Sequence, residues 1–186
     1  MRSINIAVLV GSLRKESLNN KLARAIAVLA PADFAFQHVR IDDLPPYNQE
    51  DDAKPAESVA RMREQIAAAD GLMFVTPEYN RSIPGVLKNA IDHGSRPFGK
   101  SVWTGKPGGV IGISPSPLGT AIAQQHLRSI LSYLDVRTIG QPEVYLKSED
   151  GLFDEAGEIQ NHATRQFLES WMSRYIGWIR QHAAHQ

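Results

Sequence analysis

The residues best suited to chemistry lie in the stretch Thr76–Gly85, which reads TPEYNRSIPG. It follows the apolar run Leu72–Val75 and precedes the helical run Val86–His93, so the local pattern is strand, loop and helix. Two prolines stiffen the loop, and its remaining groups can donate or accept hydrogen bonds. Open α/β sheets bind ligands beyond the carboxyl ends of their strands. We therefore interpret this loop as a wall that holds a flat heterocyclic ring.

A second polar loop, residues 11–19, leads into a helical pattern and suits a phosphate group. Free N–H groups and the helix dipole attract anions at a helix N-terminus. Ser12, Ser17 and Asn19 could add donors, and Arg14 could add a charged fork. The loop lacks the G-x-G-x-x-G pattern, which favours a phosphomonoester over a dinucleotide. The competing interpretation is that Ser17 or Asn19 only caps the helix and that Arg14 is a solvated charge.

A third loop, residues 114–119, follows a glycine-rich apolar run. Ser114 could complete the polar rim of a site, although the segment could equally be a plain turn. The stretch at 76–85 also has a purely structural interpretation, in which Pro77 and Pro84 merely end a strand and open a helix.

The apolar patterns around these loops predict strands that alternate with helices. Strands are expected at 4–10, 34–41, 72–76, 108–114 and within 136–145, and helices at 18–29, 59–69, 84–94, 122–134 and 167–179. Alternation implies parallel strands joined by right-handed crossovers. We expect one domain over residues 1–186, an α/β three-layer sandwich of flavodoxin-like strand order 2-1-3-4-5. In that order the three loops meet at one edge of the sheet.

The composition excludes several classes of function. Lys plus Arg and Asp plus Glu both number 20, so we expect neither a nucleic-acid surface nor a polybasic membrane anchor. The chain has no cysteine and no run of about 18 apolar residues, so disulfides and membrane-spanning helices are not expected. The six histidines show no metal-binding spacing, so no metal site is predicted. The N-terminus does not resemble a signal peptide, and a cytoplasmic location is expected.

Two motifs carry a resemblance to a known family. Residues 11–19 read GSLRKESLN, and residues 76–92 read TPEYNRSIPGVLKNAID. Together they resemble the NAD(P)H-dependent FMN reductases, and among them the bacterial chromate and quinone reductases. The resemblance covers essentially the whole chain, although the Pro115–Pro117 turn departs from the family pattern. It implies a flavodoxin-like fold, FMN as cofactor, and a homodimer or homotetramer.

The same resemblance implies roles for individual residues. The FMN phosphate would be surrounded by Ser12, Arg14, Ser17, Leu18 and Asn19. The isoalloxazine ring would be lined by Pro77, Glu78, Tyr79 and Asn80, with Ser114 at its pyrimidine side.

In the mechanism that this implies, NADPH or NADH gives a hydride to flavin N5, and a small-molecule acceptor then takes the electrons. Quinones, free flavins and oxyanions such as chromate are the expected acceptors. No side chain need act as a nucleophile, so no catalytic side chain is predicted. Arg96 is a candidate for holding an anionic substrate, and its competing interpretation is a solvated loop arginine.

Two alternative functions compete with this one. An FMN-binding electron-transfer module would share the same loops without turning over NAD(P)H. An NTPase is suggested by residues 94–101, which match the P-loop pattern G-x-x-x-x-G-K-[ST]. A P-loop must follow a strand and open a helix, whereas this segment follows a helical run, so we rank the NTPase third.

Overall fold

The structure is a computed structural model that describes residues 3–183. The strands are β1 (Ile4–Val10), β2 (Phe34–His38), β3 (Gly71–Val75), β4 (Pro107–Ser114), β5 (Arg137–Thr138) and β6 (Val144–Lys147). The helices are α1 (Leu18–Ala27), α2 (Glu57–Ala67), α3 (Gly85–Ser95), α4 (Ala121–Tyr133) and α5 (His162–Ala183), with a short 3-10 helix at Gln49–Asp51.

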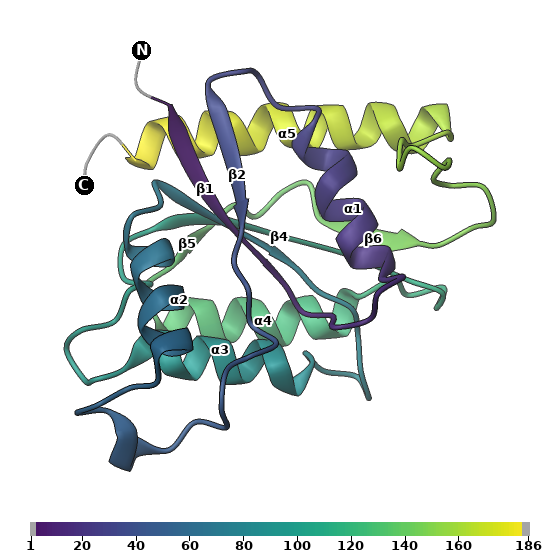
Figure 1. The fold of residues 1–186 in the computed structure, drawn as a ribbon. Coiled ribbons are helices and arrows are strands. Elements are labelled where there is room, and N and C mark those ends of the chain that lie inside the picture. Colours follow the sequence, from purple (N-terminus) through teal and green to yellow (C-terminus); the bar gives the residue numbers. More distant parts are fainter. Residues whose placement is uncertain (1–2, 184–186) are drawn as a thin grey trace.

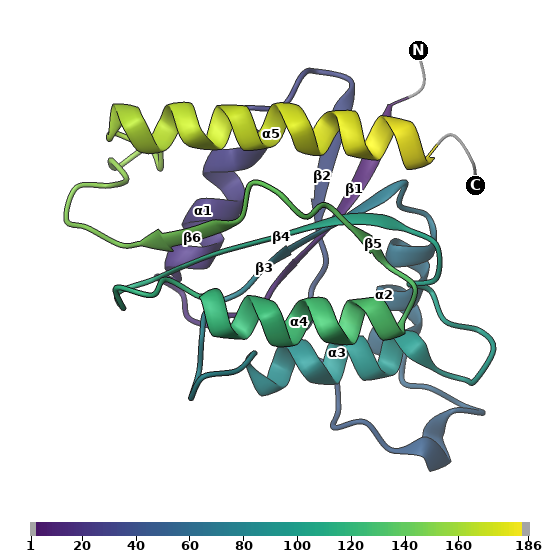
Figure 2. The same ribbon diagram turned by 180° about the vertical axis from the view of Figure 1, so that it is seen from behind.

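All strand pairs are parallel, and the sheet has the order β2-β1-β3-β4-β5, with β6 also paired to β4. Helices α1 and α5 cover one face of the sheet, and α2, α3 and α4 cover the other (Figure 1; Figure 2 shows the reverse side). The predicted flavodoxin-like three-layer sandwich is confirmed. Of the helices in residues 3–183, none combines the length and apolar character needed to span a membrane.

The two faces of the sheet explain why β1 is a continuous apolar run. Ile6 and Val8 pack into the core beneath α1 and α5, whereas Ala7 and Leu9 pack into the core beneath α2, α3 and α4. Successive side chains of a strand point to opposite faces, so a strand covered on both sides must be apolar at every position.

The outer strand beside β4 differs from the prediction. One strand was expected within residues 136–145, but the structure has two short strands there. β5 pairs with Pro107 and Gly108, and β6 pairs with Ile111–Ser114. Between them lies Gly140-Gln141-Pro142, and proline has no N–H to give to a ladder, so the strand is interrupted. The predicted second strand is also shorter, because β2 ends at His38 rather than at residue 41.

The P-loop-like segment 94–101 has a structural role. It starts at the end of α3 rather than after a strand. A side chain at Gly94 would collide with the indole ring of Trp103, which is fully buried and donates to the carbonyl of Ile91 at 2.9 Å. Arg63 donates to the carbonyls of Gly94 at 3.1 Å and Lys100 at 2.7 Å. The glycine and the backbone of this segment are therefore used for packing.

We predict that Gly94→Ala lowers the free energy of unfolding by about 1–3 kcal/mol, because the new methyl group overpacks the site of Trp103. The matched control is Gly85→Ala in the same helix, where a methyl group would meet nothing within 4 Å. Urea unfolding of both variants measures the difference. Equal stability of the two variants would contradict the packing role.

Candidate functional site

The loops after β1, β3 and β4 leave the sheet at one edge. The three strands are neighbours, with Val10, the last residue of β1, beside Val75, the last of β3, and Val75 beside Ile111, three residues before the end of β4. The pairing continues into the loops, because Gly11 N–H donates to the carbonyl of Val75 at 2.9 Å and Thr76 N–H to that of Ile111 at 3.0 Å. The structure therefore brings the three predicted loops together.

The first loop ends at the N-terminus of α1, which has a side-chain cap but no acidic residue in its first turn. Ser17 is the N-cap of α1, and its hydroxyl accepts a hydrogen bond from Asn20 N–H at 3.2 Å. The first turn of α1 carries no acidic residue, so its positive end is not neutralised from within the helix. Ser12 is also buried at this loop, and Leu18 packs partly against the core. Leu18 would therefore meet a phosphate through its backbone N–H.

Asn19 has a contact that the sequence does not indicate. Its side-chain amide donates to the carbonyl of Ile113 at 2.9 Å and accepts from the N–H of Ile113 at 3.1 Å. Ile113 lies two residues after Ile111, so its backbone groups point to the same side of β4, the side of β3. β3 ends at Val75, which pairs with Ile111, and therefore does not reach Ile113. The Asn19 side chain replaces the missing strand and ties α1 to β4. Its backbone N–H is the group that would face a phosphate.

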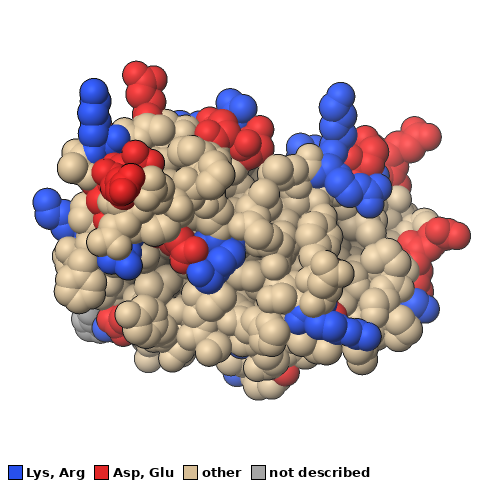
Figure 3. Space-filling model, turned by 90° about the horizontal axis from the view of Figure 1, so that it is seen from below, with Lys and Arg blue, Asp and Glu red and all other residues tan. Residues whose placement is uncertain are grey.

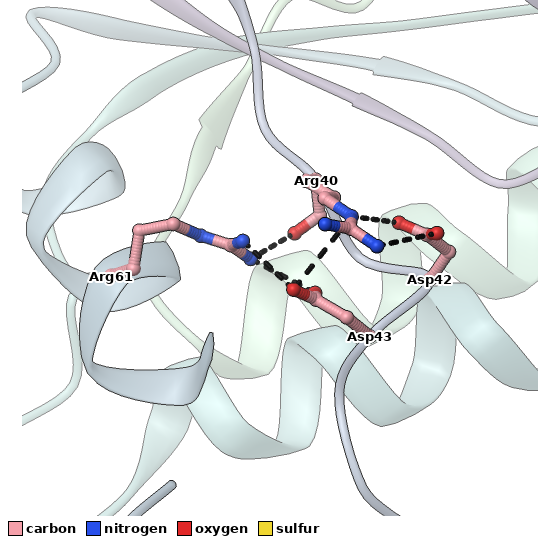
Figure 4. A network of polar contacts seen from close by, with 4 residues as sticks. All are labelled: Arg40, Asp42, Asp43 and Arg61. Carbon is pink, nitrogen blue, oxygen red and sulfur yellow. Dashed lines mark hydrogen bonds and ion pairs between the residues drawn. The ribbon is translucent and has the colours of Figure 1, made fainter. Parts of the chain in front are cut away.

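Arg14 is a cation of the first loop that could bind an anion. It is exposed, and among residues 3–183 no ion pair or hydrogen bond of its side chain is described. Beyond β2, by contrast, Arg40 and Arg61 are neutralised by two aspartates (Figure 4). The Nε of Arg40 bonds Asp42 at 2.7 Å, and the Nη1 of Arg61 bonds Asp43 at 2.9 Å.

These hydrogen bonds lower the pKa of the carboxyl groups of Asp42 and Asp43, chiefly through Arg40 and Arg61 respectively. Both acids therefore stay charged at neutral pH and balance the two arginines. The network fixes the chain after β2 against α2, and its arginines are balanced by carboxylates, whereas Arg14 is not part of it.

The second loop contains a tight turn at residues 79–82. Tyr79 and Ser82 exchange backbone hydrogen bonds of 2.9 and 3.0 Å, and Asn80 and Arg81 have positive φ values of 50° and 64°. This is the geometry of a type I′ turn, in which both central residues are left-handed. Left-handed non-glycine residues cost free energy and gather at functional sites. Pro77 is buried, whereas Tyr79 and Asn80 are exposed at the edge.

Glu78 points away from this turn toward α4. Its Oε2 accepts hydrogen bonds from the N–H groups of Ile122 at 3.0 Å and Ala123 at 3.1 Å. Its Oε1 lies 3.4 Å from Nη1 of Arg81. The carboxylate thus joins the second loop to the helix that follows the third. Only the backbone of Glu78 remains for a ring to contact.

In the third loop the hydroxyl of Ser114 shapes a turn. It donates to the carbonyl of Gly119 and accepts from Ser116 N–H at 3.1 Å. Gly119 has a φ of 58°, and a side chain there would meet the backbone of Tyr145 at 2.7 Å. The turn containing Pro115 and Pro117 is therefore held closely against β6.

Arg96 is not brought to this edge. It follows the last residue of α3, whose first residue lies beside the second loop. At 1.5 Å per residue, 11 helical residues separate Arg96 from the loop by about 16 Å. Arg96 instead lines a cavity of about 250 Å³ together with Arg63 and His93.

The residues at the edge fit FMN. An anion would find the open N-terminus of α1, two serine hydroxyls and an available arginine. Each loop also leaves one large apolar side chain about half exposed, namely Leu13, Tyr79 and Leu118. A ligand with an anionic end and a flat apolar body matches this combination. Within residues 3–183 no group of three or more side chains could hold a metal ion.

Comparisons with known proteins agree with this chemistry. The family described as NADPH-dependent FMN reductase matches residues 4–150. A 2-hydroxy-1,4-benzoquinone reductase of Burkholderia sp is 52% identical over 178 residues, which are 96% of this chain and 97% of the relative. A quinone reductase of Escherichia coli K12 is 36% identical over 183 residues, which are 96% of each chain.

Among solved structures, the flavoenzyme NAD(P)H:(acceptor) oxidoreductase FerB of Paracoccus denitrificans has a TM-score of 0.93 at 40% identity. The match covers 96% of this chain and 98% of FerB. A flavodoxin of Pseudomonas aeruginosa has a TM-score of 0.60 at 19% identity, covering 95% and 99% of the two chains. At that identity the flavodoxin is evidence for the fold alone.

We predict that Asn19→Ala lowers the free energy of unfolding by about 2–4 kcal/mol, because it leaves the N–H and carbonyl of Ile113 buried without partners. Asn20→Ala is the neighbouring control, since Asn20 uses its backbone N–H in the bond to Ser17. Its loss should stay below about 1 kcal/mol. Urea unfolding in the absence of cofactor measures both. A loss for Asn19→Ala no larger than the control would refute the tie to β4.

Proposed function

The chain belongs to the NADPH-dependent FMN reductase family, and we propose that it is a quinone reductase whose FMN is held at the edge formed by the three loops. It is an NAD(P)H-dependent flavoenzyme. One observation supports this location of the FMN site. The N-terminus of α1, Arg14 and the half-exposed apolar side chains all lie at one edge of the sheet.

The first loop binds the phosphate of FMN. The hydroxyls of Ser12 and Ser17 and the backbone N–H groups of Leu18 and Asn19 donate to it, and Arg14 balances its charge. The second loop holds the ring against the backbone of residues 77–80, with Tyr79 beside it. Ser114 fixes the turn at the pyrimidine side. The chemistry that FMN supplies when bound is acceptance of a hydride from reduced nicotinamide and donation of electrons to a second substrate.

The protein contributes position and charge to this reaction. The type I′ turn and the two prolines keep the second loop in one conformation, so the ring is oriented before either substrate arrives. Half-exposed Tyr79 leaves one side of the site open, which allows the nicotinamide and the acceptor to use it in turn. No side chain is assigned as a nucleophile or general acid.

The acceptor class follows from the relatives. Proteins 52% and 46% identical to this chain are named 2-hydroxy-1,4-benzoquinone reductase and quinone reductase. A quinone is flat and matches the apolar surface of the loops. Free flavins and oxyanions such as chromate are further acceptors in this proposal. Reduced nicotinamide is a cytoplasmic electron source, so we place the reaction in the cytoplasm.

We further propose a homodimer, or a homotetramer built from it, that forms through α3 and α4. Phe98 is 89% exposed and Tyr133 is 86% exposed beside these helices. The face over α3 and α4 is mostly uncharged, although a cluster of opposite charges lies within it (Figure 3), and α3 exposes the ion pair of Lys88 and Asp92 at 2.8 Å. Exposed aromatic groups on an uncharged face are typical of protein interfaces.

The turnover test separates a reductase from an electron carrier. The purified protein, saturated with FMN, should oxidise NADPH continuously once 1,4-benzoquinone is added. The protein freed of FMN should not. Bound FMN without NADPH oxidation would contradict the reductase and favour the electron-transfer module that shares this fold.

We predict that Arg14→Ala raises the dissociation constant of FMN about tenfold, because a charge-assisted hydrogen bond to the phosphate is lost. Lys15→Ala is the matched control, since it removes an adjacent exposed charge and should weaken FMN binding less than threefold. Quenching of flavin fluorescence measures both constants. Equal effects of the two variants would show that only the general positive charge of the loop matters.

A further inference from the structure

Glu78 is a nearly buried carboxylate in the loop that faces the proposed ring. Its side chain is only 7% exposed. The two hydrogen bonds from Ile122 and Ala123, at 3.0 and 3.1 Å, both end on one oxygen, Oε2. Burial of a charged group is costly unless it is paired and hydrogen-bonded. The placement of this charge therefore needs an explanation beyond solubility.

Helix α4 lacks a cap of its own, and Glu78 supplies one. Its N-cap residue, Thr120, makes no capping hydrogen bond, and the first turn contains no acidic residue. The hydroxyl of Thr120 accepts instead from the side chain of Gln124 at 2.8 Å. The first N–H groups of a helix have no partner within the helix. Glu78 satisfies two of them from a loop 44 residues away.

The charge of Glu78 is only partly balanced from outside the helix. Arg81 lies 3.4 Å from Oε1, but the side chain of Arg81 is 64% exposed, and solvent screens such a pair strongly. The remaining partner of the carboxylate is the positive end of α4. Both lie at the edge where the second and third loops meet. Any ring held by these loops sits in a field set by that carboxylate and that helix end.

We propose that Glu78 is a positioning residue that locks the ring-lining loop to α4, and that its negative charge weakens the binding of reduced FMN relative to oxidised FMN. This inference rests on the proposed function, in which the ring lies against residues 77–80. Reduction adds negative charge to the flavin, and a fixed carboxylate nearby raises the free energy of that form. Without the carboxylate, the N-terminus of α4 would favour it.

The test is Glu78→Gln. Glutamine has the same shape, and its amide oxygen can still accept the two N–H groups of α4, while the charge is lost. Dissociation constants are measured by titration for oxidised FMN in air and for dithionite-reduced FMN under argon. We expect oxidised FMN to bind within about threefold of wild type. The dissociation constant of reduced FMN divided by that of oxidised FMN should fall about tenfold, because reduced FMN gains affinity. This change equals a rise of about 30 mV in the two-electron reduction potential.

Two further variants make the result specific. Glu169→Gln removes a charge from an exposed pair with Arg165 on α5 and should leave the ratio unchanged. Arg81→Gln removes the exposed counter-charge of Glu78 and should raise the same ratio about twofold, because reduced FMN then binds more weakly. It also keeps the question answerable if Glu78→Gln does not fold.

An unchanged ratio in the folded variants of Glu78 and Arg81, with FMN still bound, would overturn the role of Glu78 and leave the proposed function intact. A wild-type protein that binds neither form of FMN would instead overturn the proposed function, and the inference with it.

Discussion

Two buried polar contacts hold the functional edge together, and both end on β4 or the helix that follows it. The amide of Asn19 takes the place of a strand beside Ile113, and the carboxylate of Glu78 caps α4. The parallel sheet brings three loops to one edge but does not fix them against one another. These contacts do so, the first joining the loop after β1 to β4 and the second joining the loop after β3 to α4.

This arrangement explains how the three polar loops can be rigid although no apolar core packs around them. The loops are short and half exposed, so apolar packing cannot hold them. Their backbone groups are instead satisfied by side chains: Ser17 caps α1, Glu78 caps α4, and Ser114 closes the turn before α4. The set that suits FMN in this proposal consists of the backbone N–H groups of Leu18 and Asn19, the side chain of Arg14 and the half-exposed apolar side chains.

Much of the fold could be predicted from the sequence, because its signals are local. Continuous apolar strands, helical periodicity and the N-cap at Ser17 each lie within one segment, and alternation of strand and helix then limits the topology. The break between β5 and β6 was missed because an edge strand can be interrupted at Gly140–Pro142 without exposing the core. The contact of Asn19 with Ile113 spans 94 residues and that of Glu78 with Ile122 spans 44, so no local pattern reveals them.

The most direct test of the account is hydrogen exchange measured on the backbone with and without FMN. If three loops hold one cofactor at one sheet edge, all three should be protected when the cofactor binds. FMN should therefore slow exchange together in residues 11–20, 76–82 and 114–123, and leave the segment around Arg96 unchanged. Slower exchange confined to residues 45–63 and 93–97, which line the cavity beside Arg96, would contradict the account.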